Sequence, residues 1–119
     1  MRRRRIVRQV QPQLPVTDLP RAMAFHRRLG FDVEAYEGGG HAFVMDSDTE
    51  LWHLREVDDL AGGTNQAALY AHVRDPDALR ARLADEGLDP SPVVSEPWGM
   101  REFSLTDPDG NLLRFGTNT

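Results

Sequence analysis

An internal repeat is the sequence feature that most constrains the fold of this chain. The apolar runs and turn around Asp46 align with those around Asp107, which follows about 61 residues later. Asp18 and Asp75 each open an amphipathic segment, and each of these segments stops at a glycine. A duplicated folding unit accounts for this spacing.

The two amphipathic segments, 18–30 and 75–87, are predicted helices. Each begins with an aspartate suited to N-capping, has a proline near the first turn and ends at a glycine suited to the C′ position. Apolar residues recur at helical spacing, as with Leu79 and Leu83 in the second segment.

Strand-like runs precede and follow each predicted helix. The order strand, helix, strand, strand, strand occurs twice, which predicts an α+β fold. We expect two tandem βαβββ modules that form a curled mixed sheet around a cleft. The single domain of residues 1–119 is divided into a basic tail 1–9, a first module 10–57, a linker 58–65 and a second module 66–119.

Period-two alternation along the strands separates a core face from an open face. Val10 in the first predicted strand belongs to the core face. Trp52 also belongs to the core face, so its neighbour His53 is expected on the open face. Arg114, beside Phe115, occupies the equivalent position in the second module. The predicted lining of the cleft is Gln11, Gln13, His53, Tyr70, His72 and Arg114.

Charge is distributed unevenly along the chain. The fourteen basic residues are all arginines, and five of them lie in the first eight residues, which contain no acid. The remaining nine oppose nineteen acidic residues, so the body carries a net charge of about −10. A body this acidic repels nucleic acid and attracts cations. The arginine cluster is either a nucleic-acid arm or, as we favour, a solvated terminus.

Two absences restrict the possible chemistry. The chain has no cysteine, which excludes disulfides, thiolate catalysis and Cys-ligated metals, and a cytoplasmic location is expected. No run approaches the ~20 apolar residues of a membrane span, so we expect no membrane partner.

The stretches VTDLPRAMAFHRRLGF (16–31) and REFSLTDPDGNLLRF (101–115) resemble the vicinal oxygen chelate superfamily. That superfamily includes glyoxalases, bleomycin-resistance proteins, extradiol dioxygenases and fosfomycin-resistance enzymes. The resemblance covers nearly the whole chain after Val10 and implies the paired βαβββ fold. It says less about activity, because this fold hosts many chemistries.

The resemblance also implies a metal site with one ligand from each of four strands. Ala68 has no donor atom, and the arginine side chain is a permanent cation without a usable lone pair. The other two residues fall short of the roughly three protein ligands of a catalytic metal site. We therefore expect no cofactor and no catalytic residue. The matching positions are Gln11, His53, Ala68 and Arg114.

The segment EPWGMREF, residues 96–103, is most similar to the bleomycin-resistance branch. The resemblance to that branch implies a metal-free dimer that binds a cationic antibiotic and stacks its flat rings on aromatic side chains. Trp98 matches the tryptophan of that branch, although Met100 looks like a one-residue insertion. The expected ligand-binding residues are Trp98, Gly99, Tyr36, His53, Gln11, Tyr70 and Arg114.

Two functions follow from the resemblance. The favoured one is a homodimer that sequesters a small molecule, such as a planar cationic antibiotic, and so confers antibiotic resistance. The alternative is a metal-dependent lyase, isomerase or dioxygenase that holds a divalent ion on Gln11 and His53, with Glu50 or Glu102 as a further ligand. Arg114 needs a partner in either case, because an unpaired charge in a cleft is costly. Glu50, Glu102 and a ligand carboxylate are the candidates.

Single residues leave further alternatives open. Trp98 is a stacking platform or a lid on the edge of the core. Tyr36 belongs to the binding site or is a plain surface residue. His53 is a metal ligand, a general base or, as we favour, a hydrogen-bonded cleft histidine. His26 and His41 are expected on the surface.

Overall fold

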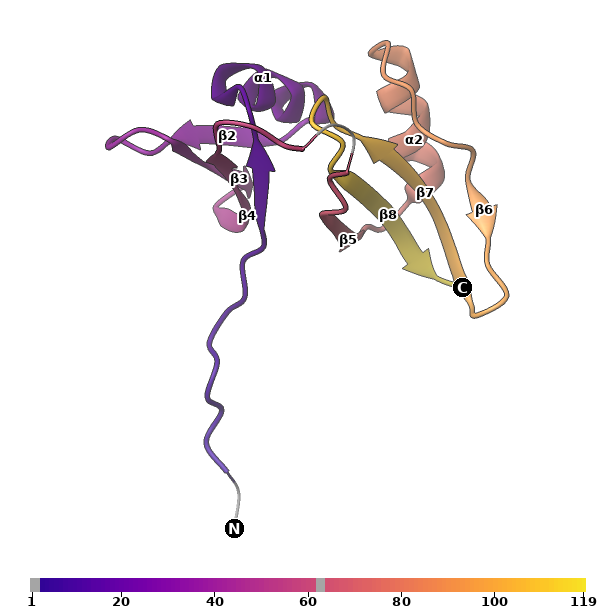
Figure 1. Cartoon of the computed structure of the whole chain (residues 1–119). Helices are drawn as coiled ribbons and strands as arrows, with labels where there is room; N and C mark the ends of the chain where they lie inside the picture. The colour runs from indigo at the N-terminus through magenta and orange to yellow at the C-terminus, as the bar shows by residue number, and fades with distance from the viewer. Residues whose placement is uncertain (1–2, 62–63) are drawn as a thin grey trace.

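A computed structural model describes residues 3–61 and 64–119 (Figure 1). Residues 1–2 of the predicted tail and 62–63 of the predicted linker lie outside the described residues. The first module comprises β1 (Gln13–Val16), α1 (Leu19–Leu29), β2 (Asp32–Ala35), β3 (His41–Asp46) and β4 (Thr49–Glu56). The second comprises β5 (Ala68–His72), α2 (Pro76–Asp85), β6 (Val94–Ser95), β7 (Met100–Thr106) and β8 (Leu112–Asn118). The α+β fold with two βαβββ modules is confirmed.

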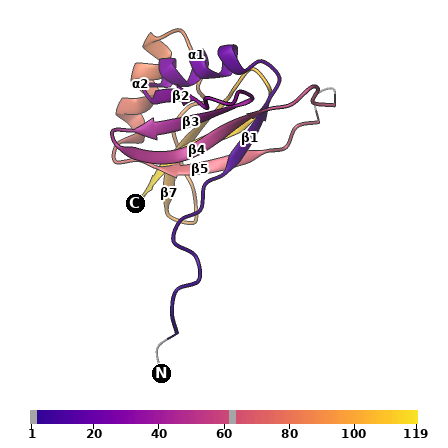
Figure 2. The same cartoon turned by 90° about the vertical axis from the view of Figure 1, so that its left-hand side faces the viewer.

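Each module has its own four-stranded mixed sheet. The strand orders are β1-β4-β3-β2 and β5-β8-β7-β6, and in each sheet the first strand pairs in parallel with the last while the others are antiparallel. Each helix covers one face of its own sheet, and the sheets are curled but not closed (Figures 1 and 2). Within the residues that the structure describes, no helix covers the opposite, open faces.

The helix boundaries follow the capping signals of the sequence. The carboxylates of Asp18 and Asp75 accept hydrogen bonds of 3.0 Å from the backbone N–H groups of Arg21 and Ala78. Gly30, with φ of 105°, ends α1 in the left-handed conformation that favours glycine. Local sequence therefore sets where each helix starts and stops.

The core lies between the helices and the sheets and continues from one module into the other. Trp52 and Phe115 are buried, as their parity predicts. Two sequence predictions about the core are wrong. Val10 is 77% exposed, because β1 begins only at Gln13 and the preceding residues project from the fold (Figure 1).

His26 is the second correction. It was expected on the surface, but its side chain is fully buried in α1. Its Nδ1 lies 2.9 Å from the carbonyl oxygen of Ala22, and its Nε2 accepts a 3.2 Å hydrogen bond from the Trp52 indole. Both ring nitrogens thus have partners, which allows the imidazole to sit in the core.

The turn 107–111 of the second module fastens it to the first. The side-chain amide of Asn111 donates to the carbonyl oxygen of Pro15 at 2.9 Å. The Asp109 carboxylate accepts hydrogen bonds of 3.1 and 2.6 Å from the backbone N–H and the hydroxyl of Thr17. These contacts hold the two sheets with their helix-side faces toward each other. Among the residues that the structure describes, neither helix is long and apolar enough to cross a membrane.

Candidate functional site

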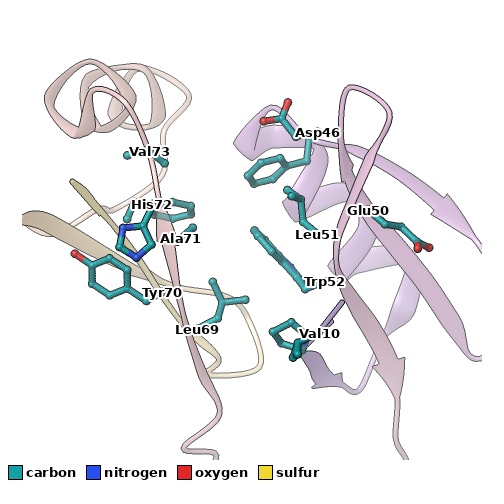
Figure 3. Close-up of a pocket in the computed structure, with 13 residues that line it drawn as sticks. Val10, Asp46, Glu50, Leu51, Trp52, Leu69, Tyr70, Ala71, His72 and Val73 are labelled. Carbon is teal, nitrogen blue, oxygen red and sulfur yellow. The ribbon is translucent and has the colours of Figure 1, made fainter. Parts of the chain in front are cut away.

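A crevice of about 370 Å³ lies between the two modules. Figure 3 shows Trp52 and Leu51 of β4 on one side of it and Leu69 and Ala71 of β5 on the other. Most of these residues have core parity, so this crevice extends the core. Of the predicted cleft residues only Tyr70 and His72 line it. Glu50 points away from Trp52 (Figure 3), toward the open face of the first sheet.

The open face of the first sheet carries a chain of polar side chains, joined by two hydrogen bonds and one longer contact between a carboxylate and an imidazole. The Gln11 amide donates to Oε2 of Glu50 at 2.9 Å, and Oε1 of Glu50 lies 3.6 Å from Nε2 of His53. Nδ1 of His53 lies 2.9 Å from Nε2 of His41. The structure therefore joins the predicted site residues Gln11 and His53 through Glu50, and it adds His41.

His41 was expected on the surface, but it is only partly exposed and belongs to this chain. Desolvation lowers the pKa of His41, and the nearby His53 and Arg55 lower it further. The imidazole is therefore held toward its neutral form. A neutral histidine ring has one nitrogen that donates and one that accepts.

An aromatic hollow of about 370 Å³ lies beside His41. Its lining is Tyr36, Gly39, Gly40, His41 and Phe43. The ring centroids of Tyr36 and Phe43 are 6.4 Å apart in an edge-to-face arrangement. Tyr36 is 51% exposed. Sequence reasoning missed Phe43, although its position between the buried residues Ala42 and Val44 signals the open face.

The open face of the second sheet carries a separate hollow of about 170 Å³, here called the Trp98 hollow. Trp98 is 68% exposed, so it is not a lid on the core edge. It sits in the turn between β6 and β7, where Gly99 has a positive φ of 89°. The lining is Ser91, Pro92, Val94, Glu96, Trp98, Glu102, Phe103, Ser104 and Arg114.

Arg114 reaches this hollow from β8, opposite Ser104 on β7. In the part of the chain that the structure describes, its guanidinium has neither the Glu50 nor the Glu102 partner that the sequence suggested. Arg114 is exposed, so its charge is open to solvent. The Trp98 hollow thus combines one cation with the carboxylates of Glu96 and Glu102.

Tyr70 lies on β5, opposite Arg114 of β8 in the strand register. Its hydroxyl is buried against Gly116, where any Cβ would clash with it. Desolvation raises the pKa of Tyr70, and the Glu102 carboxylate raises it further. The hydroxyl therefore stays protonated. It is a donor without a described acceptor.

The positions that the fold implies as metal ligands do not fit a metal in this chain. His53 lies on the first sheet and Gln11 just before its strand β1, whereas Ala68 and Arg114 lie on the second sheet. One of the four is a methyl group and another is a permanent cation. Within residues 3–61 and 64–119, no group of three or more His, Asp or Glu side chains could hold an ion.

The expected ligand-binding residues therefore form two groups within one chain. Tyr36, Gln11 and His53 belong to the open face of the first sheet. The second group, on the open face of the second sheet, is Trp98, Gly99, Tyr70 and Arg114. The chain fold alone does not unite them.

Comparison with known families gives a match over residues 8–115 to the family model described as Glyoxalase/Bleomycin resistance protein/Dioxygenase superfamily. No curated protein is significantly similar in sequence.

Solved structures of similar fold include a bleomycin-binding protein complexed with bleomycin, at 22% identity and a TM-score of 0.83, covering 95% of this chain and 100% of that one. Another is TnmS3, an antibiotic-binding protein from Streptomyces sp. CB03234, at 27% identity and 0.77, covering 98% and 100%. A third is the bleomycin-binding protein from Streptomyces verticillus with copper(II)-bleomycin, at 27% and 0.74, covering 96% and 100%.

Proposed function

Because the chain belongs to the Glyoxalase/Bleomycin resistance protein/Dioxygenase superfamily, we propose that it is a bleomycin-resistance-like binding protein. Its ligand is a small, planar, cationic molecule of the antibiotic kind, and it protects by sequestration without making or breaking bonds. The 27% identity to two structures described as antibiotic-binding and bleomycin-binding proteins supports this proposal. We place the protein in the cytoplasm, because a chain without cysteine has no disulfide that reducing conditions could break.

The observation that carries the proposal is the composition of the Trp98 hollow. An exposed indole offers a flat face for stacking, and such contacts contribute roughly 0.5–1.5 kcal/mol beyond area burial. Glu96 and Glu102 beside it supply negative charge, and a cation over an indole gains further attraction. The acidic body of the protein attracts the same ligands from a distance.

Metal-independence is the second part of the proposal. It rests on the donor set, in which Ala68 and Arg114 stand where chelating side chains are expected. Elemental analysis of protein purified without chelators tests it. We expect no stoichiometric divalent ion. An ion that is bound stoichiometrically and lost in His53→Ala would favour the metal-dependent lyase, isomerase or dioxygenase instead.

A homodimer is the third part. The aromatic hollow and the Trp98 hollow lie on separate open faces, so a second copy is needed to bring Tyr36 of one chain near Trp98 of the other. Ile6 and Val7 are exposed on the N-terminal segment that projects from the fold (Figures 1 and 2), which offers further apolar surface to a second copy. Sedimentation equilibrium should give twice the chain mass.

Fluorescence titration with bleomycin and with ethidium tests the binding function. We expect saturable quenching from Trp98, because Trp52 is buried and should respond little. Both substitutions at Trp98 remove the reporting indole, so the variants are compared by the fluorescence of bound ethidium. Trp98→Leu should bind much more weakly, and Trp98→Phe should retain part of the affinity, since the smaller ring still stacks. Absence of quenching by every planar cation tried would count against the proposal.

A further inference from the structure

The orientation of the His41–His53 pair can be derived from the charge beside it. Two arrangements satisfy the 2.9 Å contact between Nε2 of His41 and Nδ1 of His53, because either ring can be the donor. If a neutral His53 ring donated, its Nε2 would be a bare lone pair, buried and facing the Glu50 carboxylate at 3.6 Å. Two acceptors facing each other repel.

The other arrangement removes this conflict. His41 donates from Nε2, and His53 carries its proton on Nε2, directed toward Glu50. Gln11 holds the second carboxylate oxygen of Glu50 at 2.9 Å, which fixes the carboxylate in place. A carboxylate that selects the tautomer of an adjacent histidine is a common arrangement in protein sites.

The tautomer of His41 determines whether its Nδ1 donates or accepts a hydrogen bond. With the proton on Nε2, its Nδ1 is a lone pair, and no group in the described part of the chain donates to it. His41 lines the aromatic hollow together with Tyr36 and Phe43. Its ring lies 5.7 Å from that of Phe43. The hollow therefore has aromatic walls, and the His41 ring in its lining carries an acceptor nitrogen.

We propose that Glu50 and His53 orient His41 as a hydrogen-bond acceptor, and that the aromatic hollow binds planar ligands whose ring edge carries an N–H or O–H donor. This inference rests on the proposed small-molecule-binding function and narrows its ligand class. A flat ring packs against Tyr36 and Phe43, while its donor reaches Nδ1 of His41. A ring of the same charge without a donor leaves that lone pair unsatisfied and binds less well.

Two probes of equal charge separate donor recognition from general attraction of aromatic cations. Benzamidine carries N–H donors on a planar cationic group, and phenyltrimethylammonium carries none. Nuclear magnetic resonance titrations of the full chain, followed at Tyr36 and His41, should give about tenfold tighter binding of benzamidine. In His41→Phe that preference should vanish, while the affinity for phenyltrimethylammonium stays within about twofold.

The tautomers provide a second readout that needs no ligand. Nitrogen-15 shifts should place the proton of both His41 and His53 on Nε2. Glu50→Gln should change that distribution, whereas Glu34→Gln, which removes a charge from the same sheet face in register with Phe43, should not.

A proton on Nδ1 of His41, or an unchanged benzamidine preference in His41→Phe, overturns the inference and leaves the proposed function standing. If neither probe binds the wild-type protein, the inference fails, and the bleomycin and ethidium titration at Trp98 decides the proposed function separately.

Discussion

The indole N–H of Trp52 in β4 donates a 3.2 Å hydrogen bond to Nε2 of His26 in α1, inside the core of the first module. Nδ1 of His26 lies 2.9 Å from the carbonyl oxygen of Ala22 and must carry the proton there. The ring is therefore neutral. A second proton on Nε2 would break the bond to Trp52.

This bond predicts a pH-dependent stability. Burial lowers the pKa of His26 below its ordinary value of 6.5, and the backbone bond to Ala22 and the charge of Asp107 offset only part of that effect. Below about pH 6.5, His26 binds a proton in the unfolded chain but not in the folded chain, so the free energy of unfolding decreases as the pH falls. Urea unfolding at pH 7.5 and 5.5 measures the loss.

The matched variant is His26→Gln, whose amide oxygen still accepts from Trp52 but does not titrate. Its stability should change less between the two pH values than that of the wild type. His41, whose pKa is also lowered, contributes equally to both proteins and cancels. Identical pH dependence of the two proteins would show that His26 is not responsible.

Leu83→Ala should destabilise the protein strongly. Leu83 is fully buried and attaches α2 to the core. Removing a buried leucine side chain of this kind costs about 2–5 kcal/mol. Leu79→Ala, one turn earlier and only partly buried, should cost clearly less in the same denaturation experiment. Equal losses would contradict the packing described for α2.

Asn111→Ala should weaken the junction between the modules. The buried amide of Asn111 donates to the Asp107 carboxylate at 2.7 Å and to Pro15 at 2.9 Å, and its oxygen accepts from Asn65 at 2.9 Å. Leaving these groups unpaired costs about 1–3 kcal/mol or more. Asn118→Ala, at the exposed end of β8, is the control and should have little effect on thermal unfolding.

Gly116→Ala should destabilise the protein through a steric clash, and Tyr70→Phe should relieve part of that clash. A Cβ at this position collides with the Tyr70 hydroxyl and approaches the Arg101 carbonyl oxygen. Overpacking of this kind costs about 1–3 kcal/mol. In Tyr70→Phe the hydroxyl is gone, so adding Gly116→Ala to that background should cost less. A double-mutant cycle with purely additive effects would rule out this contact.

The arrangement of elements could be read from local sequence. The aspartate caps, the prolines and the glycine stops define both helices because capping involves residues only a few positions apart. The alternation that put Trp52 in the core and His53 opposite it follows from the period of a strand. These signals are short-range, and duplication made each of them visible twice.

The functional residues were predicted less completely. Trp98 and Arg114 do line one hollow, with Gly99 next to Trp98 in the turn, but Tyr36 and His53 belong to the other module. Phe43 and His41 were missed as partners of His53, since cross-strand pairing between β3 and β4 brings them together. Their positions, ten and twelve residues before His53, give no local indication of that contact.

The sequence by itself therefore determined two βαβββ modules, their helix ends and the face of most strand residues, because propensity, capping and side-chain alternation act over a few residues. Only the tertiary structure decided that His26 is buried, that Val10 is not, and that the two open faces point apart. Those outcomes depend on how one module packs on the other. That packing is set by contacts such as Asn111 with Pro15, which join residues 96 positions apart.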